Sequence, residues 1–165
     1  MTTTLDTRMT GLNLGPNNLV GTVPDSIGKL GQLSELGLFE NPGLTGTIPS
    51  AIGQLSLVQR AHLYGTGLSG SIPPAMGNLT SLMKLMLNAN RLDGSLPASL
   101  LKLTKLTKFE VQSNRLSGLV PAFDFARLSE MEQCNMDGDP GRRTNKFACP
   151  LPPNSGKCQP GPPQC

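Results

Sequence analysis

The chain is poor in aromatic residues and in clustered charge, and what it lacks excludes several classes of protein. It has no tryptophan, one tyrosine and one histidine, His62. No run of about 18 apolar residues occurs, so we expect no transmembrane helix and no direct membrane insertion. Lys and Arg form no run and the formal net charge is only +3, so nothing predicts binding to nucleic acid.

Motifs of catalysis are also missing. The sequence contains no GxSxG, P-loop or HExxH motif and no paired carboxylates in a catalytic context. Asp137 and Asp139 lack the further oxygen ligands that a calcium loop places at regular spacing. We therefore expect a protein that is not an enzyme and that holds neither a metal nor a cofactor.

Cysteine is absent until Cys134, and the other three cysteines are Cys149, Cys158 and Cys165. They show no C-x-x-C spacing and no nearby histidine, so an even set in a Pro-rich tail favours disulfides and an oxidising compartment over zinc. Four cysteines allow three pairings. The short loop between Cys149 and Cys158 favours that pair, which leaves Cys134 with Cys165. We expect an extracellular or cell-surface protein whose leader is removed or absent from this chain.

The most informative feature that is present is an internal repeat. The 19 glycines and 15 prolines would by themselves be typical of disorder, but leucine recurs at regular intervals. Units of 24 or 25 residues follow the pattern LxxLxLxxNxLxGxIPxxIGxLxx. There are five of them, over residues 9–32, 33–57, 58–81, 82–105 and 106–130.

Each part of the repeat has a physical role. The LxL segment, such as Leu85 and Leu87, alternates with period two and predicts a short strand. One coil cannot bury its own leucines, so stacked coils must share a core, with parallel strands lining a curved surface. Asn17, Asn41, Asn90 and Asn114 form a column whose amides can satisfy backbone groups in the turns. Thr66 replaces this asparagine in the third unit, which predicts that its coil is the weak point.

Glycine and proline columns follow the asparagine column. The glycines permit tight backbone conformations, and the apolar residue-Pro pairs after them exclude the interior of a helix. The glycines are Gly21, Gly46, Gly70, Gly94 and Gly118, and the pairs lie at 23–24, 48–49, 72–73, 96–97 and 120–121.

Residues 9–130 resemble the plant-specific class of leucine-rich repeats, found in polygalacturonase-inhibiting proteins and in the ectodomains of receptor-like kinases. The LxGxIPxxIGxL half of the repeat carries the resemblance. It implies a leucine-rich-repeat solenoid, an α/β-type right-handed superhelix, with a short parallel sheet on the concave face and turns and 3-10 segments on the convex face. It divides the chain into repeats with an N-terminal lead-in (1–130), a disulfide-stapled C-terminal cap (131–158) and a Pro-rich tail (159–165).

The chain departs from this class at several places. Ala61 replaces a core leucine, Leu101 replaces a glycine, and a loop at 137–143 interrupts the last coil. The N-terminal cysteine cap of the class is missing. An uncovered first repeat would expose core and an unpaired strand edge. The chain is therefore expected to be part of a larger protein, or to have this end covered by a neighbouring domain or a second copy of itself.

Binding is expected on the outward strand positions, because the inward ones form the core. In order these positions are Gly11-Asn13-Gly15-Pro16, Glu35-Gly37-Phe39-Glu40, Arg60-His62-Tyr64-Gly65, Lys84-Met86-Asn88-Ala89 and Lys108-Glu110-Gln112-Ser113. Among them we single out seven candidate ligand-binding residues: Glu35, Phe39, Arg60, His62, Tyr64, Lys84 and Lys108. Arg60, Lys84 and Lys108 occupy the same repeat position, so we expect them to form a basic stripe across strands that are about 4.8 Å apart. The alternative is that these residues merely face solvent on a scaffold.

The sequence predicts a recognition module for a protein, peptide or glycan ligand. The alternative function is a structural subunit that assembles through the solenoid ends into a filament, wall or matrix. Asn78, in Asn78-Leu79-Thr80, is a glycosylation sequon, although the repeat pattern itself generates this tripeptide. Ice binding would require regular Thr or Asn columns on a flat face, and the outward strand columns are too irregular for it.

Overall fold

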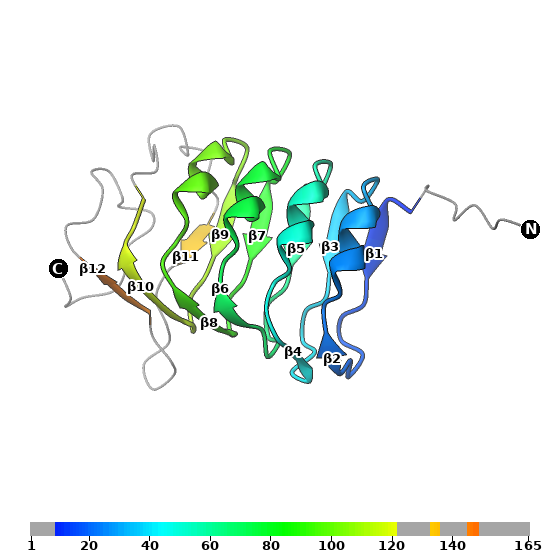
Figure 1. Ribbon diagram of the computed structural model, residues 1–165, viewed down its shortest axis with the longest axis horizontal. Coiled ribbons are helices and arrows are strands. Elements are labelled where there is room, and N and C mark those ends of the chain that lie inside the picture. Colours follow the sequence, from blue (N-terminus) through cyan, green and yellow to red (C-terminus); the bar gives the residue numbers. More distant parts are fainter. Residues whose placement is uncertain (1–8, 122–132, 136–144, 149–165) are drawn as a thin grey trace, which may run out of the picture.

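The computed structural model describes residues 9–121, 133–135 and 145–148 and shows a row of stacked coils (Figure 1). In the described residues, each of the first four coils runs from a short strand on one side of the molecule to a 3-10 helix on the other. Successive coils lie side by side from the N-terminal to the C-terminal end. The predicted leucine-rich-repeat solenoid, with parallel strands and 3-10 segments, is confirmed.

The principal sheet contains six parallel strands, one from each coil, in the order β1-β3-β5-β7-β9-β11. Their register is strict, because Leu36 pairs with Ala61, Ala61 with Leu85 and Leu85 with Phe109. Residues one repeat apart therefore line up in columns across the sheet. The strands are β1 (Gly11–Asn13), β3 (Glu35–Gly37), β5 (Arg60–His62), β7 (Lys84–Met86), β9 (Lys108–Glu110) and β11 (Gln133–Asn135).

The opposite side of the coils carries four 3-10 helices. Each follows an extended proline whose carbonyl accepts the first i to i+3 hydrogen bond, as in Ile52 N–H to Pro49 O at 3.0 Å. Gly53 of η2 lies so close to the next coil that a Cβ would be 2.5 Å from Ala75 O. The helices are η1 (Asp25–Lys29), η2 (Ser50–Gln54), η3 (Pro74–Asn78) and η4 (Ala98–Lys102).

Two smaller parallel sheets form along the edge where the chain returns from the principal sheet. The sequence analysis expected only turns here. Glycines with positive φ mark this edge, among them Gly46 at 78° and Gly118 at 83°. One sheet contains β2 (Gly21–Thr22) and β4 (Leu44–Thr45). The other, in the order β12-β10-β8-β6, contains β6 (Ser69–Ser71), β8 (Arg91–Gly94), β10 (Arg115–Leu119) and β12 (Lys146–Ala148).

The core is a continuous apolar stack between the principal sheet and the 3-10 helices. Leu33, Val58, Leu82 and Leu106 occupy the same place in successive coils and are all buried. The first coil is less enclosed, and Leu12 is only partly buried against this core. Burial thus depends on having a neighbouring coil, as expected for a repeat that cannot cover its own leucines.

Buried asparagine side chains join consecutive coils. Asn41 Nδ2 donates to Leu38 O of its own coil at 2.9 Å and to Leu14 O of the preceding coil at 3.0 Å. Asn41 Oδ1 accepts the backbone N–H of Leu19 at 2.9 Å. Asn114 repeats this bonding pattern, so the asparagine column acts as predicted.

Two members of that column differ. Asn17 is exposed in the first coil and does not take the inward position that was predicted for it, since the described residues contain no preceding coil to which its amide could bond. Thr66 is buried, and its hydroxyl donates to Asn90 Oδ1 and accepts the N–H of Leu68 at 3.4 Å. The Thr66 hydroxyl thus forms a bridge between this N–H and Asn90, whereas Asn41 accepts the equivalent N–H directly. That this coil is the weak point stays a prediction.

Several expectations lie outside the described residues. These include Cys149, Cys158 and Cys165, the side chain of Cys134, the loop at 137–143 and most of the cap and tail. In the part of the chain that is described, no helix is long and apolar enough to cross a membrane.

We predict that Asn114→Ala lowers the free energy of unfolding by about 3 kcal/mol, because Leu87 O, Val111 O and Leu92 N–H would lose a buried partner. Chemical denaturation followed by circular dichroism measures this. The matched control is Asn17→Ala, the exposed member of the same column, which should change stability by less than about 0.5 kcal/mol. Equal effects of the two substitutions would show that the amide column does not hold the coils together.

Candidate ligand-binding surface

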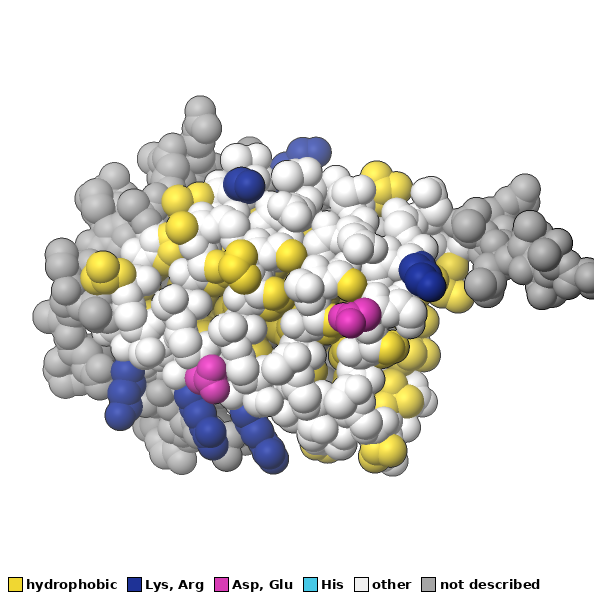
Figure 2. Space-filling view, in the orientation of Figure 1, with side chains coloured by type: hydrophobic (Ala, Val, Ile, Leu, Met, Phe, Trp, Pro, Cys, Tyr) yellow, Lys and Arg dark blue, Asp and Glu magenta, His cyan; other side chains and the backbone are white. Residues whose placement is uncertain are grey.

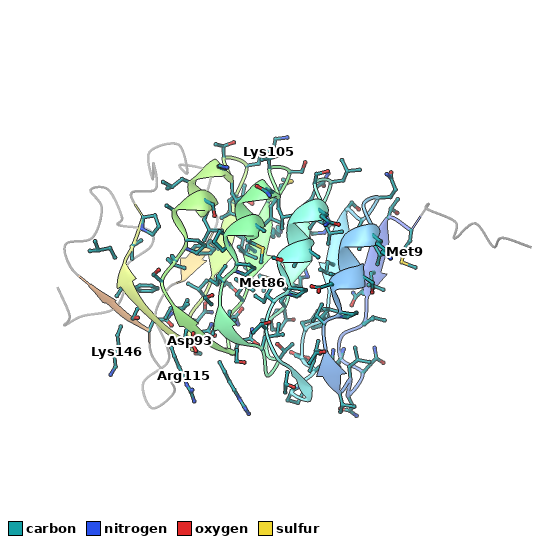
Figure 3. The ribbon with its side chains drawn as sticks, viewed as in Figure 1. Met9, Met86, Asp93, Lys105, Arg115 and Lys146 are labelled. Atoms are coloured by element: carbon teal, nitrogen blue, oxygen red, sulfur yellow. The ribbon has the colours of Figure 1, made fainter. Side chains whose placement is uncertain are left out.

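The outward surface of the principal sheet, called here the six-stranded face, brings the candidate residues into columns. Glu35 pairs in register with Arg60, Arg60 with Lys84 and Lys84 with Lys108. The basic residues are therefore neighbours across the sheet, as the sequence predicted. Figure 3 labels Met86 at the end of β7, in the column next to them.

The charge of the basic stripe is partly compensated. Arg60 Nη2 lies 2.9 Å from Glu35 Oε2, and both side chains are substantially exposed. Lys108 Nζ lies 3.2 Å from Glu110 Oε1. An exposed ion pair such as Arg60–Glu35 contributes about 0–1 kcal/mol, so a charged ligand can compete for these two partners.

Glu110 differs from the sequence expectation. It was placed among outward, solvated positions, but only 5% of its surface is accessible. A buried carboxylate requires a partner, and the ammonium group of Lys108 supplies one.

Phe39 and Tyr64 form a stacked pair at the next position along the strands. Their ring centroids are 5.1 Å apart and the ring planes differ by 12°. His62 lies edge-on to Phe39 with centroids 6.3 Å apart. Gly15 makes room for the pair, since a Cβ there would lie 2.8 Å from the Phe39 ring. The aromatic column predicted from the sequence is thus a packed platform, and all three rings are half-buried.

The surroundings of His62 lower the pKa of its imidazole. Burial lowers its pKa, and Arg60, Lys108 and Lys84 lower it further while Glu35 opposes them. Its Nε2 atom is buried without a hydrogen-bond partner among the described residues. The Nε2 atom could therefore form a hydrogen bond with a bound ligand.

Beyond Tyr64 the same column contains two amides that the sequence analysis did not single out. Asn88 Oδ1 and Gln112 Oε1 are buried, and no partner for either is found within the described part of the chain. The Tyr64 hydroxyl has a raised pKa, first because of burial and then because of Glu40 and Glu110. In the sequence, the one signal that could have identified these amides is that they occupy the same repeat position as Phe39 and Tyr64.

The edge formed by the smaller sheets presents a second regular surface. Many residues beside the glycine column carry hydroxyl groups, although Val20, Asp93 and Leu119 interrupt the pattern. All but one of the residues named next, the half-buried Ser69, are exposed. We call this set the hydroxyl surface: Thr22, Thr45, Thr47, Ser69, Ser71 and Ser95. The Thr47 methyl group lies against Gly70 of the next coil, so the spacing of the columns is fixed by coil packing.

Charged side chains gather at the C-terminal end of this edge. Figure 2 shows Lys and Arg side chains along the lower margin of the molecule, where Figure 3 labels Arg115 and Lys146 with Asp93 nearby. Arg115 pairs in register with Asp93, and Ser117 with Lys146. Within the described ranges, no group of three His, Cys, Asp or Glu could hold a metal ion.

No protein-family model and no curated protein sequence matches the chain. Solved structures do match. The ectodomain of the receptor kinase GASSHO1/SCHENGEN3 from Arabidopsis thaliana, in complex with CASPARIAN STRIP INTEGRITY FACTOR 2, is 32% identical over 92% of this chain, with a TM-score of 0.80. The HAESA ectodomain from Arabidopsis, bound to an extended IDA peptide hormone, is 35% identical over 87%, with a TM-score of 0.72.

A plant ice-binding protein is 28% identical over 86% of this chain, with a TM-score of 0.70. The chain spans 17% of the GASSHO1/SCHENGEN3 structure, 23% of the HAESA structure and 44% of the ice-binding protein. The repeat pattern, the confirmed solenoid and these neighbours lead to one conclusion. The chain is a plant-type leucine-rich-repeat protein that resembles the ectodomains of plant receptor kinases.

Proposed function

We propose that this chain is a non-catalytic, extracellular or cell-surface recognition module that binds a peptide or protein segment on its six-stranded face. The observation that carries the proposal is the stacked Phe39–Tyr64 pair, which sits between ionised side chains on a rigid sheet. Aromatic and Arg side chains of this kind dominate the affinity of binding surfaces. The neighbours solved with peptide ligands support a peptide rather than a glycan.

The partly compensated charges fit a polar ligand. The Arg60–Glu35 pair is exposed, so a ligand carboxylate can replace Glu35 as the partner of the guanidinium group. Glu35 would then be hydrated and not left as a buried unpaired charge. His62 Nε2, Asn88 Oδ1 and Gln112 Oε1 offer buried polar atoms that lack partners in the described residues. An extended peptide carries backbone donors and acceptors that could satisfy them.

We predict that Tyr64→Ala and Arg60→Ala each weaken binding of peptides selected from a displayed random library at least tenfold, because each removes an anchor of the surface. Isothermal titration calorimetry measures the affinities. The matched control is Lys102→Ala on η4, an exposed cation on the opposite side of the coils, which should bind like the wild type. A library that yields no binder, or binders insensitive to Tyr64 and Arg60, would contradict the proposal. The second of these results is expected for a structural subunit that assembles only through its ends, because Tyr64 and Arg60 lie on the six-stranded face.

We also propose that Asn78 is glycosylated. It is the exposed last residue of η3, where η1, η2 and η4 end in Lys29, Gln54 and Lys102, so the position borders solvent in every coil. A glycan there lies away from the six-stranded face.

Secretion from a eukaryotic host should yield protein whose electrophoretic mobility increases after enzymatic removal of N-glycans. Thr80→Ala should abolish this shift while leaving Asn78 in place. A wild-type protein with no shift would refute the modification.

Ice binding is a second candidate, and the hydroxyl surface is the observation that favours it. The sequence analysis set this function aside because the outward strand columns are irregular. The regular columns lie instead at the smaller sheets, where Thr47 pairs with Ser69 in the next coil. A solenoid neighbour is a plant ice-binding protein.

Recrystallisation of ice in a frozen protein solution tests this candidate. Wild-type protein should keep the crystals small, and the double substitution Thr47→Lys/Ser71→Lys should remove the effect, since charges disrupt a uniform hydroxyl array. Arg60→Ala, on the other face, is the control and should retain it. Ice growth that is unaffected by the wild type excludes the candidate.

A further inference from the structure

The electrostatic environment changes along the strands of the six-stranded face. At the start of the strands lie Arg60, Lys84 and Lys108, and these three cations lower the pKa of His62. Four residues beyond Arg60 lies Tyr64, whose pKa is raised by burial and then by the carboxylates of Glu40 and Glu110. Glu40 therefore adds negative charge beside Tyr64 at the far end of the face, whereas the charge of Glu110 is compensated by Lys108.

The same end of the face is rich in hydrogen-bond acceptors. Asn88 and Gln112 follow Tyr64 in its column, one and two coils further on, which separates them by about 4.8 Å at the sheet. Asn88 Oδ1 and Gln112 Oε1 are both buried without partners among the described residues. Buried acceptors are normally satisfied in native proteins, so these two oxygens are suited to accept N–H groups of a ligand.

A planar cation with several N–H groups meets these requirements. Its flat face can stack on Tyr64, its N–H groups can reach amide oxygens on neighbouring coils, and its charge suits the adjoining carboxylate. We propose that Tyr64, Asn88 and Gln112, with Glu40 beside them, form a subsite for a guanidinium group such as the side chain of an arginine.

This inference rests on the proposed function, because it specifies one side chain of the bound peptide. An arginine at this subsite and an acidic group near Arg60 would give the peptide a fixed direction across the sheet. Lysine would fit less well, since its compact ammonium group cannot stack as a plane or span two acceptors.

The protein provides its own reporter for the test. It has one tyrosine and no tryptophan, so its near-ultraviolet fluorescence arises from Tyr64. We expect N-acetyl-arginine N-methylamide to change this fluorescence saturably in the millimolar range. The citrulline analogue has nearly the same shape without the charge, and it should bind about tenfold more weakly.

A matched pair of variants locates the subsite. Glu40→Gln should weaken binding of the arginine probe about fivefold by removing a nearby charge. Asp25→Asn, which removes an exposed carboxylate from η1 on the opposite side of the coils, should leave it unchanged. The inference is overturned by a response that does not saturate, by equal responses to the arginine and citrulline probes, or by a stronger response to N-acetyl-glutamate N-methylamide.

Failure of this inference can be told apart from failure of the proposed function. Library-selected peptides that depend on Tyr64 but keep their affinity when every arginine is replaced by citrulline would refute only the guanidinium subsite. The absence of any selected peptide would refute the broader proposal, whatever the arginine probe does.

Discussion

The buried asparagine column is the interaction on which the rest of the structure depends. Each coil must turn sharply after its strand, and the turn leaves backbone groups facing the core. An amide can donate twice and accept twice, so Asn41 and Asn114 each satisfy groups in two consecutive coils. This bonding closes the turn and at the same time fixes how one coil stacks on the next.

Because the coils stack in strict register, equivalent residues of successive repeats form columns. The side chains in these columns determine the chemistry of the surface. Phe39 and Tyr64 stack because they occupy equivalent positions of adjacent coils, and the absence of a side chain at Gly15 leaves space beside them. The same register brings Asn88 and Gln112 next to the aromatic pair. A binding surface therefore arises from substitutions at a few repeat positions without any change of the scaffold, which is why the fold alone does not specify a ligand.

The two regular surfaces of the solenoid suit different ligands. The six-stranded face varies from coil to coil and combines rings, amides and charges, as expected for a ligand that is itself irregular, such as a peptide. The hydroxyl surface places at least one Thr or Ser beside the glycine of each coil, as a periodic ligand would require, although Val20, Asp93 and Leu119 interrupt it. Glycines with positive φ, such as Gly46 and Gly70, produce the second surface by bringing the returning chains of adjacent coils together.

The sequence by itself determined the repeat length, the strand positions, the leucine core and the neighbours across the sheet, because these follow from local periodicity. It also predicted the aromatic pair and the basic column. Only the tertiary structure decided that Glu110 is buried, that Arg60 pairs with Glu35 and that Asn88 and Gln112 lack partners. Burial and pairing depend on the curvature of the sheet and on side-chain reach between coils, and neither quantity is contained in a one-dimensional pattern.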